Sequence, residues 1–135
     1  HAHADWPTYS GGDFNRPLTP RGKEDAAAAA LAIRDAGLSP SLVLTSPAQR
    51  ALQTAQILAA TLNLPAARLR FVDALYNASA DELDAQLRQA VAPGAITMLI
   101  AHNPGISDLA RHLANDASRP PFAPAGWASF TYAAT

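Results

Sequence analysis

Short apolar segments alternate with longer segments of helical pattern along most of the chain, and this alternation constrains the fold more than any other feature. Residues 41–46 (SLVLTS), 68–75 (RLRFVDAL) and 95–101 (AITMLIA) have the length and composition of strands. The last of them is almost entirely apolar, as in a strand buried on both faces. Because strands that alternate with helices form a mostly parallel sheet flanked by helices, we predict an α/β three-layer sandwich.

The helix that follows residues 41–46 has the clearest start signal. It is expected to begin at Ser46, with Ser46 as the cap and Pro47 at the first helical position. Gln49, three residues after Ser46, would complete a capping box. Ser79 and Glu82 show the same pattern further along. In all, helices are expected over residues 20–36, 46–62, 79–92 and 104–115.

The two ends of the sequence are expected to hold incomplete strands. The first expected helix has no strand before it except the short stub at His1. We therefore expect the given sequence to begin at the carboxyl end of a first strand that is largely absent from it. Residues 129–135 (SFTYAAT) have the pattern of a last strand, which can also be incomplete. With 135 residues, positions 1–135 are expected to form one domain.

Composition excludes several classes of function. The net charge is −1, so no basic field attracts nucleic acid or an anionic membrane. The chain has no cysteine, which excludes disulfides, thiol catalysis and cysteine zinc sites. No apolar run approaches the roughly 20 residues that a membrane-spanning helix needs. We expect a soluble, cytoplasmic protein with neither a nucleic-acid nor a membrane partner.

Three residues with chemical potential fall where the expected strands end. His1 ends the presumed first strand, Arg50 lies in the first turn of the second helix, and His102 directly follows residues 95–101. Ligands of such sheets bind at the carboxyl ends of the strands, near helix N-termini. A cation in a first helical turn opposes the helix dipole, so Arg50 is either a solvated surface residue or the holder of an anion. His102 is either a site residue or a hydrogen-bonded core histidine, and His112 is expected on the surface.

The opening residues HAHAD allow three interpretations. His1 and His3 lie on one side of an extended segment, and Asp5 could complete a zinc site. The same residues could be the remnant of a purification tag. A zinc hydrolase of this kind would need another histidine where Trp6 stands. The third interpretation is that this stretch is the end of a strand whose beginning is not in the given sequence.

Four stretches resemble motifs of the histidine phosphatase superfamily, whose fold is called phosphoglycerate-mutase-like. Residues 13–22 (DFNRPLTPRG) are similar to the Arg-Pro-Leu-Thr-x-x-Gly signature of the SixA-type phosphohistidine phosphatases. Residues 45–55 (TSPAQRALQTA) match the motif Ser-Pro-x-x-Arg-x-x-Gln-Thr-Ala, and residues 100–106 (IAHNPGI) resemble the second-histidine segment. His1-Ala2 is similar to the end of Arg-His-Gly, with alanine in place of glycine. The four motifs in order are far more specific than any one of them.

The resemblance implies a role for four residues. His1 would be the nucleophile that becomes phosphorylated, Arg50 and Arg16 would hold the phosphoryl oxygens, and His102 would donate hydrogen bonds to them, in a protonated form if necessary. The family's other phosphate arginine, just before the nucleophile, is not in this sequence. Arginine suits this work because its planar fork of donors stays charged, and phosphoryl transfer mainly needs positioning and charge stabilisation. No metal or other cofactor is implied.

The same resemblance favours one substrate class. Many esterases of this fold carry a glutamate proton donor after the third strand, and here residues 72–79 (VDALYNAS) place Ala74 there, beside Asp73. Asp73 or Asp13 could serve as the acid instead. The SixA branch also lacks that glutamate, so the expected reaction is dephosphorylation of phosphohistidine on a partner protein. The alternatives are a small-molecule phosphomonoesterase and a catalytically inactive relative that only binds phosphorylated partners.

Overall fold

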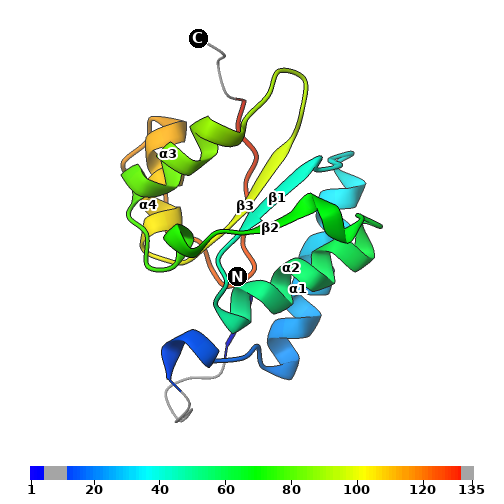
Figure 1. Cartoon of the computed structure of the whole chain (residues 1–135). Helices are drawn as coiled ribbons and strands as arrows, with labels where there is room; N and C mark the ends of the chain where they lie inside the picture. The colour runs from blue at the N-terminus through cyan, green and yellow to red at the C-terminus, as the bar shows by residue number, and fades with distance from the viewer. Residues whose placement is uncertain (5–11, 132–135) are drawn as a thin grey trace.

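The computed structural model describes residues 1–4 and 12–131 of the chain. In these ranges three parallel strands form a sheet in the order β2–β1–β3. Helices α1 and α2 lie on one side of this sheet and α3 and α4 on the other (Figure 1). The strands are β1 (Leu42–Thr45), β2 (Leu69–Phe71) and β3 (Thr97–Ile100), and the helices are α1 (Pro20–Asp35), α2 (Gln49–Thr61), α3 (Ala80–Ala90) and α4 (Gly105–Ala114). The predicted three-layer α/β fold is therefore confirmed.

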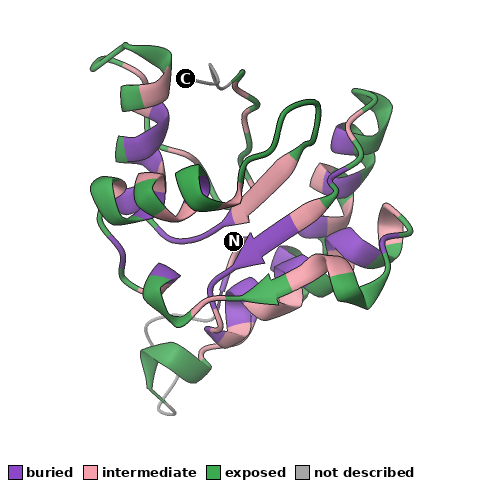
Figure 2. Ribbon diagram, turned by 45° about the horizontal axis from the view of Figure 1, so that its top comes forward, coloured by how far each residue is buried: buried purple, intermediate pink, exposed green. Residues whose placement is uncertain are grey.

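The central strand β1 divides the core into two clusters. Its successive side chains point to opposite faces of the sheet, so Val43 packs with α1 and α2 while Leu44 packs with α3 and α4. Both side chains are buried, and buried residues gather between the sheet and the helices (Figure 2). In the described ranges, no helix is long and apolar enough to cross a membrane.

The outer strands differ from the prediction in two ways. The strand expected over residues 68–75 is shorter, because β2 ends at Phe71 and Asp73–Leu75 form a 3₁₀ turn, η3. The strand expected to be buried on both faces is β3, but Ile100 is its only buried residue. Thr97, Met98 and Leu99 line a cavity that runs along this strand, which leaves their side chains only partly buried.

The start of α2 corrects another prediction. Ser46 does not cap this helix, which begins at Gln49 with Ala48 as a cap that makes no side-chain hydrogen bond. The helix starts too late for a serine at position 46 to reach its first turn. The Ser46 hydroxyl instead accepts a hydrogen bond from the Ala48 amide, at 3.2 Å, and contacts His102. The capping box of Ser79 and Glu82 at the start of α3 is present as predicted.

The expected terminal strands are not seen in the described residues. Residues 1–3 are in no strand, and Ala4 forms one isolated antiparallel bridge with Leu18. The backbone nitrogen of His1 nevertheless donates to the carbonyl of Ala101, just beyond β3, at 3.2 Å. Residues 129–131 are also outside any strand, and the remainder of the predicted last strand, residues 132–135, lies outside the described residues.

Candidate active site

The ring of His1 is held in one tautomer. Its Nδ1 lies 2.6 Å from the carbonyl oxygen of Ala2, and since a carbonyl can only accept, Nδ1 carries the proton. The other nitrogen, Nε2, then has a free lone pair and accepts a hydrogen bond from Nε of Arg50 at 3.2 Å. An imidazole whose unprotonated nitrogen faces a guanidinium is arranged to attack an electrophile that carries negative charge.

Helix α2 fixes the position of this nucleophile segment. The hydroxyl of Thr54 accepts a hydrogen bond from the Ala2 amide at 3.1 Å and donates to the carbonyl of Arg50 at 2.8 Å. One side chain thus ties the backbone beside His1 to the helical turn that carries Arg50. The threonine in residues 45–55 therefore has a structural reason for standing four residues after the arginine.

Residues 13–22 make hydrogen bonds to α2 and to the segment around His1. The Leu18 amide donates to Oε1 of Gln53 at 2.7 Å, and the Thr19 amide donates to the carbonyl of His3 at 3.1 Å. Gly22 allows this close packing, because a Cβ there would lie only 1.9 Å from the His3 carbonyl oxygen. These contacts bring Arg16 and Asp13 to the side of α2 on which Arg50 lies.

Arg50 is an internal residue and not a solvated surface cation. It is 3% exposed. Its Nη1 donates to the backbone carbonyl of Asp13 at 2.6 Å, and its Nη2 donates to the Asp13 carboxylate at 3.0 Å. Every nitrogen of the guanidinium therefore has an acceptor, one of which is the nucleophilic nitrogen of His1. The interpretation that Arg50 is placed to bind an anion fits this geometry.

The Asp13 carboxylate contacts both arginines of the site and the hydroxyl of Tyr76. Arg16 Nη2 contacts its carboxylate at 3.0 Å, and the hydroxyl of Tyr76 donates to it at 2.6 Å. The hydrogen bond from Tyr76 is the main cause that lowers the pKa of Asp13 to about 2, with Arg16 and Arg50 adding to it. The same hydrogen bond raises the pKa of Tyr76 above its usual value. At neutral pH Asp13 is thus an anion and Tyr76 a neutral donor.

His102 lies beside the nucleophile. The centroids of the His1 and His102 rings are 5.1 Å apart, and His102 Nε2 lies 2.7 Å from the Ser46 hydroxyl. Its Nδ1 is buried and has no hydrogen-bond partner among the described residues. Burial, followed by the charge of Arg50, lowers the pKa of His102 to about 3, so the ring is neutral without a bound anion. A neutral imidazole can still donate from Nδ1 if the Ser46 hydroxyl donates to Nε2.

The structure brings together four residues predicted from the sequence: His1, Arg16, Arg50 and His102. Three further residues lie in the site. Ser46 was predicted to be a helix cap and Asp13 a possible acid, and Tyr76 was not predicted at all. Residues 72–79 were identified as the stretch where an acid would be sought, and it is Tyr76 from that stretch that reaches the site. Asp73, in contrast, is exposed at the start of η3.

The other two histidines differ in position, since His3 lines a small pocket with His1, Asp13 and Arg16, whereas His112 lies on α4. His112 is exposed, as expected. Nδ1 of His3 lies 2.8 Å from the Thr19 hydroxyl. Asp5, the third residue of the zinc hypothesis, lies outside the described residues. Within residues 1–4 and 12–131, no three His, Cys, Asp or Glu side chains are grouped so that they could hold a metal ion.

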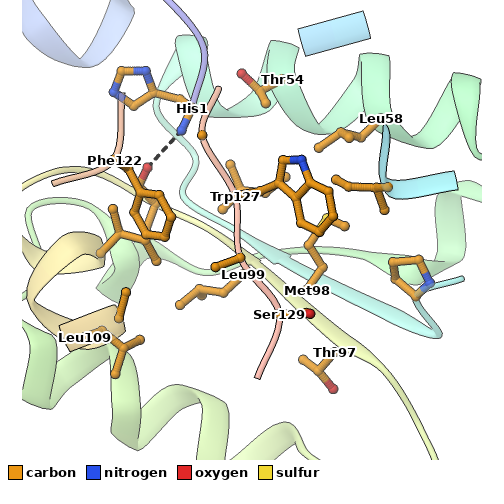
Figure 3. A pocket seen from close by; sticks show the side chains of 18 of the residues that line it. His1, Thr54, Leu58, Thr97, Met98, Leu99, Leu109, Phe122, Trp127 and Ser129 are labelled. Carbon is orange, nitrogen blue, oxygen red and sulfur yellow. Dashed lines mark hydrogen bonds between the residues drawn. The ribbon is translucent and has the colours of Figure 1, made fainter. Parts of the chain in front are cut away.

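A cavity of about 980 Å³ opens beside this site. It runs from His1 along β3, where Trp127 and Phe122 lie over Met98 and Leu99 (Figure 3). The polar end of the cavity contains His1, Arg50 and His102, whereas the remainder has a mainly apolar lining. These three predicted site residues therefore border the cavity.

Comparisons with known proteins agree with this geometry. Residues 1–92 match the sequence profile of the histidine phosphatase superfamily, branch 1. The chain is 33% identical over 81 residues to an uncharacterised chloroplastic protein of Arabidopsis thaliana; the match covers 59% of the chain and 37% of that protein. The chain thus spans little more than a third of this relative's length.

Two solved structures of similar fold are relevant. A protein assigned as the phosphohistidine phosphatase SixA of Agrobacterium tumefaciens aligns with a TM-score of 0.73 at 28% identity, covering 84% of this chain and 72% of that one. A complex of the protein histidine phosphatase SixA with tungstate aligns with a TM-score of 0.73 at 26% identity, covering 96% and 79%. From the profile match over most of its length, with the site geometry in agreement, this chain belongs to the histidine phosphatase superfamily.

Proposed function

We propose that the protein is a phosphatase that works through a phosphohistidine intermediate on His1. The observation that carries this proposal is the unprotonated Nε2 of His1, which lies 3.2 Å from the guanidinium of the buried Arg50. A nucleophile and the group that would hold the phosphoryl oxygens are thus in direct contact before any substrate arrives.

The reaction has two steps. Nε2 attacks phosphorus, the bond from phosphorus to the leaving group breaks, and the leaving group departs with its electron pair and takes up a proton. The Ala2 carbonyl, which accepts from Nδ1, stabilises the positive charge that develops on the His1 ring. Water then attacks phosphorus, the P–Nε2 bond breaks, and inorganic phosphate leaves. The charge on the equatorial oxygens is stabilised by Arg50, by Arg16 and by the Nδ1 hydrogen of His102. The proposal requires no metal ion.

The proposed substrate is phosphohistidine on a partner protein. Among the described residues the two candidate acids do not suit proton donation, because Asp13 is ionised and Asp73 is exposed, and this supports the choice. An alkyl phosphate expels an alkoxide and needs a proton in the transition state, whereas the P–N bond of phosphohistidine is weaker. The similarity to SixA structures is also consistent with it. A small-molecule phosphomonoesterase is the alternative, and a binding-only relative would show no turnover.

The test compares kcat/KM for a phosphohistidine protein or mimic with that for phosphoserine and a sugar phosphate, using one preparation. General acid assistance contributes typically about 10²–10⁴-fold, so the P–N substrate should be preferred by at least about 10²-fold. Equal or better efficiency on an alkyl phosphate would refute the phosphohistidine assignment. Failure to turn over even an activated aryl phosphate would leave the binding-only alternative.

A further inference from the structure

The carboxylate of Asp13 is held by donors from three separate parts of the chain. Nη2 of Arg50, on α2, donates to Oδ2 at 3.0 Å, and the hydroxyl of Tyr76, beyond η3, donates to the same oxygen at 2.6 Å. Nη2 of Arg16 donates to Oδ1 at 3.0 Å. Both oxygens of one anion are thus bound by two cations and a phenol.

This position overlaps with the one that a phosphoryl group needs. Phosphorus must come next to Nε2 of His1, which contacts the same guanidinium that binds Asp13. Arg50 can then reach the phosphoryl oxygens only through the nitrogens that now donate to Asp13. Carboxylate and phosphoryl groups match the arginine fork in the same way, and two anions this close repel each other. Asp13 and a substrate phosphoryl group therefore compete for the same donors.

We propose that the Asp13 carboxylate occupies the phosphoryl site of the free protein and leaves it when a phosphoryl group binds, and that Tyr76 then donates its hydroxyl to a phosphoryl oxygen. The proposal rests on the proposed function for the identity of the site. It adds Tyr76 as a binding residue and makes Asp13 a built-in competitor that weakens the binding of both substrate and product phosphate.

The surroundings allow the carboxylate to move while the donors stay in place. The Asp13 side chain is 40% exposed, but its backbone carbonyl is fixed by Nη1 of Arg50 at 2.6 Å. The Arg50 side chain is only 4% exposed and has no room to withdraw. A rotation of the Asp13 side chain alone is thus sufficient to withdraw the carboxylate from Nη2 of Arg50 and from the Tyr76 hydroxyl, while Nη1 of Arg50 stays on the Asp13 carbonyl.

Tyr76 is kept in position without the help of Asp13. Its ring packs edge-on against Phe14, with centroids 5.1 Å apart, and edge-on against His102, at 5.7 Å. When the carboxylate leaves, the hydroxyl still points toward the place that it vacated. A phosphoryl oxygen that arrives there meets a neutral donor, because the ordinary pKa of a tyrosine hydroxyl, about 10, already lies well above neutral pH.

The experiment measures the Kd of tungstate and of inorganic phosphate by calorimetry, without any turnover. Asp13→Asn keeps the shape of the side chain but removes the charge, and we expect both anions to bind about 10-fold more tightly. Tyr76→Phe should weaken tungstate binding by about 3- to 10-fold, because one donor is lost. Asp108→Asn is the matched control: it removes an ion pair of 2.8 Å with Arg111 on α4 and should leave both Kd values unchanged.

Unchanged or weaker anion binding in Asp13→Asn would overturn the competitor role, and unchanged binding in Tyr76→Phe would overturn the donor role. If Asp13→Asn does not fold, a structure of the unaltered protein with tungstate decides: Asp13 should have left Arg50, and a retained contact would refute the proposal. Since binding is measured, a chain that binds tungstate as expected but hydrolyses nothing would refute the proposed function and leave this inference standing.

Discussion

At the scale of single residues, His1 is the side chain on which the proposed chemistry depends. Replacing it by alanine should abolish turnover, because Nε2 of His1 is the nitrogen that accepts from Arg50, whereas Nε2 of His102 contacts the Ser46 hydroxyl. Rapid quench with a labelled substrate should trap a phosphorylated form of the unaltered protein that is stable to base and labile to acid. His112→Ala is the control and should retain full activity, since His112 is exposed. An acid-stable adduct would instead indicate a serine or threonine nucleophile.

At the scale of elements, α2 is the part of the fold that assembles the site. It carries Arg50, and through Thr54 it holds the backbone next to His1. Through Gln53 it also holds the segment that contains Arg16 and Asp13. The proposed nucleophile and the proposed phosphoryl-binding groups therefore share one helical support, which is what preorganised charge stabilisation requires.

Replacing Thr54 by valine tests this role of α2. Valine keeps the shape but removes two buried hydrogen bonds, so the free energy of unfolding should fall by about 1–3 kcal/mol. The rate should fall as well, because the Ala2 amide is released and His1 loses its alignment with Arg50. Denaturant unfolding and steady-state kinetics measure the two effects. Thr61→Val, at the end of the same helix, should change neither, and a stable but fully active Thr54→Val would contradict the anchoring role.

At the scale of the whole molecule, the site should make the fold sensitive to acid. The pKa of His102 is lowered from 6.5 to about 3, so the unfolded chain binds a proton between these values and the folded chain does not. The stability contributed by neutral His102 is therefore complete above about pH 6.5 and is lost as the pH falls toward 3. Asp13, with a pKa lowered to about 2, acts in the same direction below pH 3.8.

Denaturant unfolding at pH 7, 5 and 4 should show this loss as a steady fall in the free energy of unfolding. His102→Gln should flatten the pH dependence between pH 6.5 and 4, because the group that takes up the proton is gone. His112→Gln should leave the profile as it is. If His102→Gln kept the full slope, burial of His102 would not be its cause.

Much of the fold could be predicted because its signals are local. Strands β1 and β3 and the capping box at Ser79 and Glu82 depend on residues that are close in sequence. The lengths of β2 and β3 were overestimated, and β3 was expected to be more buried than it is. Those properties depend on how far the strands pair and on what packs against each side chain, and composition does not encode such tertiary contacts.

The sequence by itself determined the alternation of strands and helices, and its resemblance to the family's motifs pointed to His1, Arg16, Arg50 and His102 as candidate site residues. Only the tertiary structure decided that the Ser46 hydroxyl contacts His102 and does not cap α2. It also decided that Tyr76 donates a hydrogen bond to Asp13, which is 63 positions away in the sequence. The physical reason is that a hydrogen bond requires two atoms within about 3 Å. Local pattern sets the backbone of each element, but only the packing of α2 against its neighbours brings such distant atoms that close.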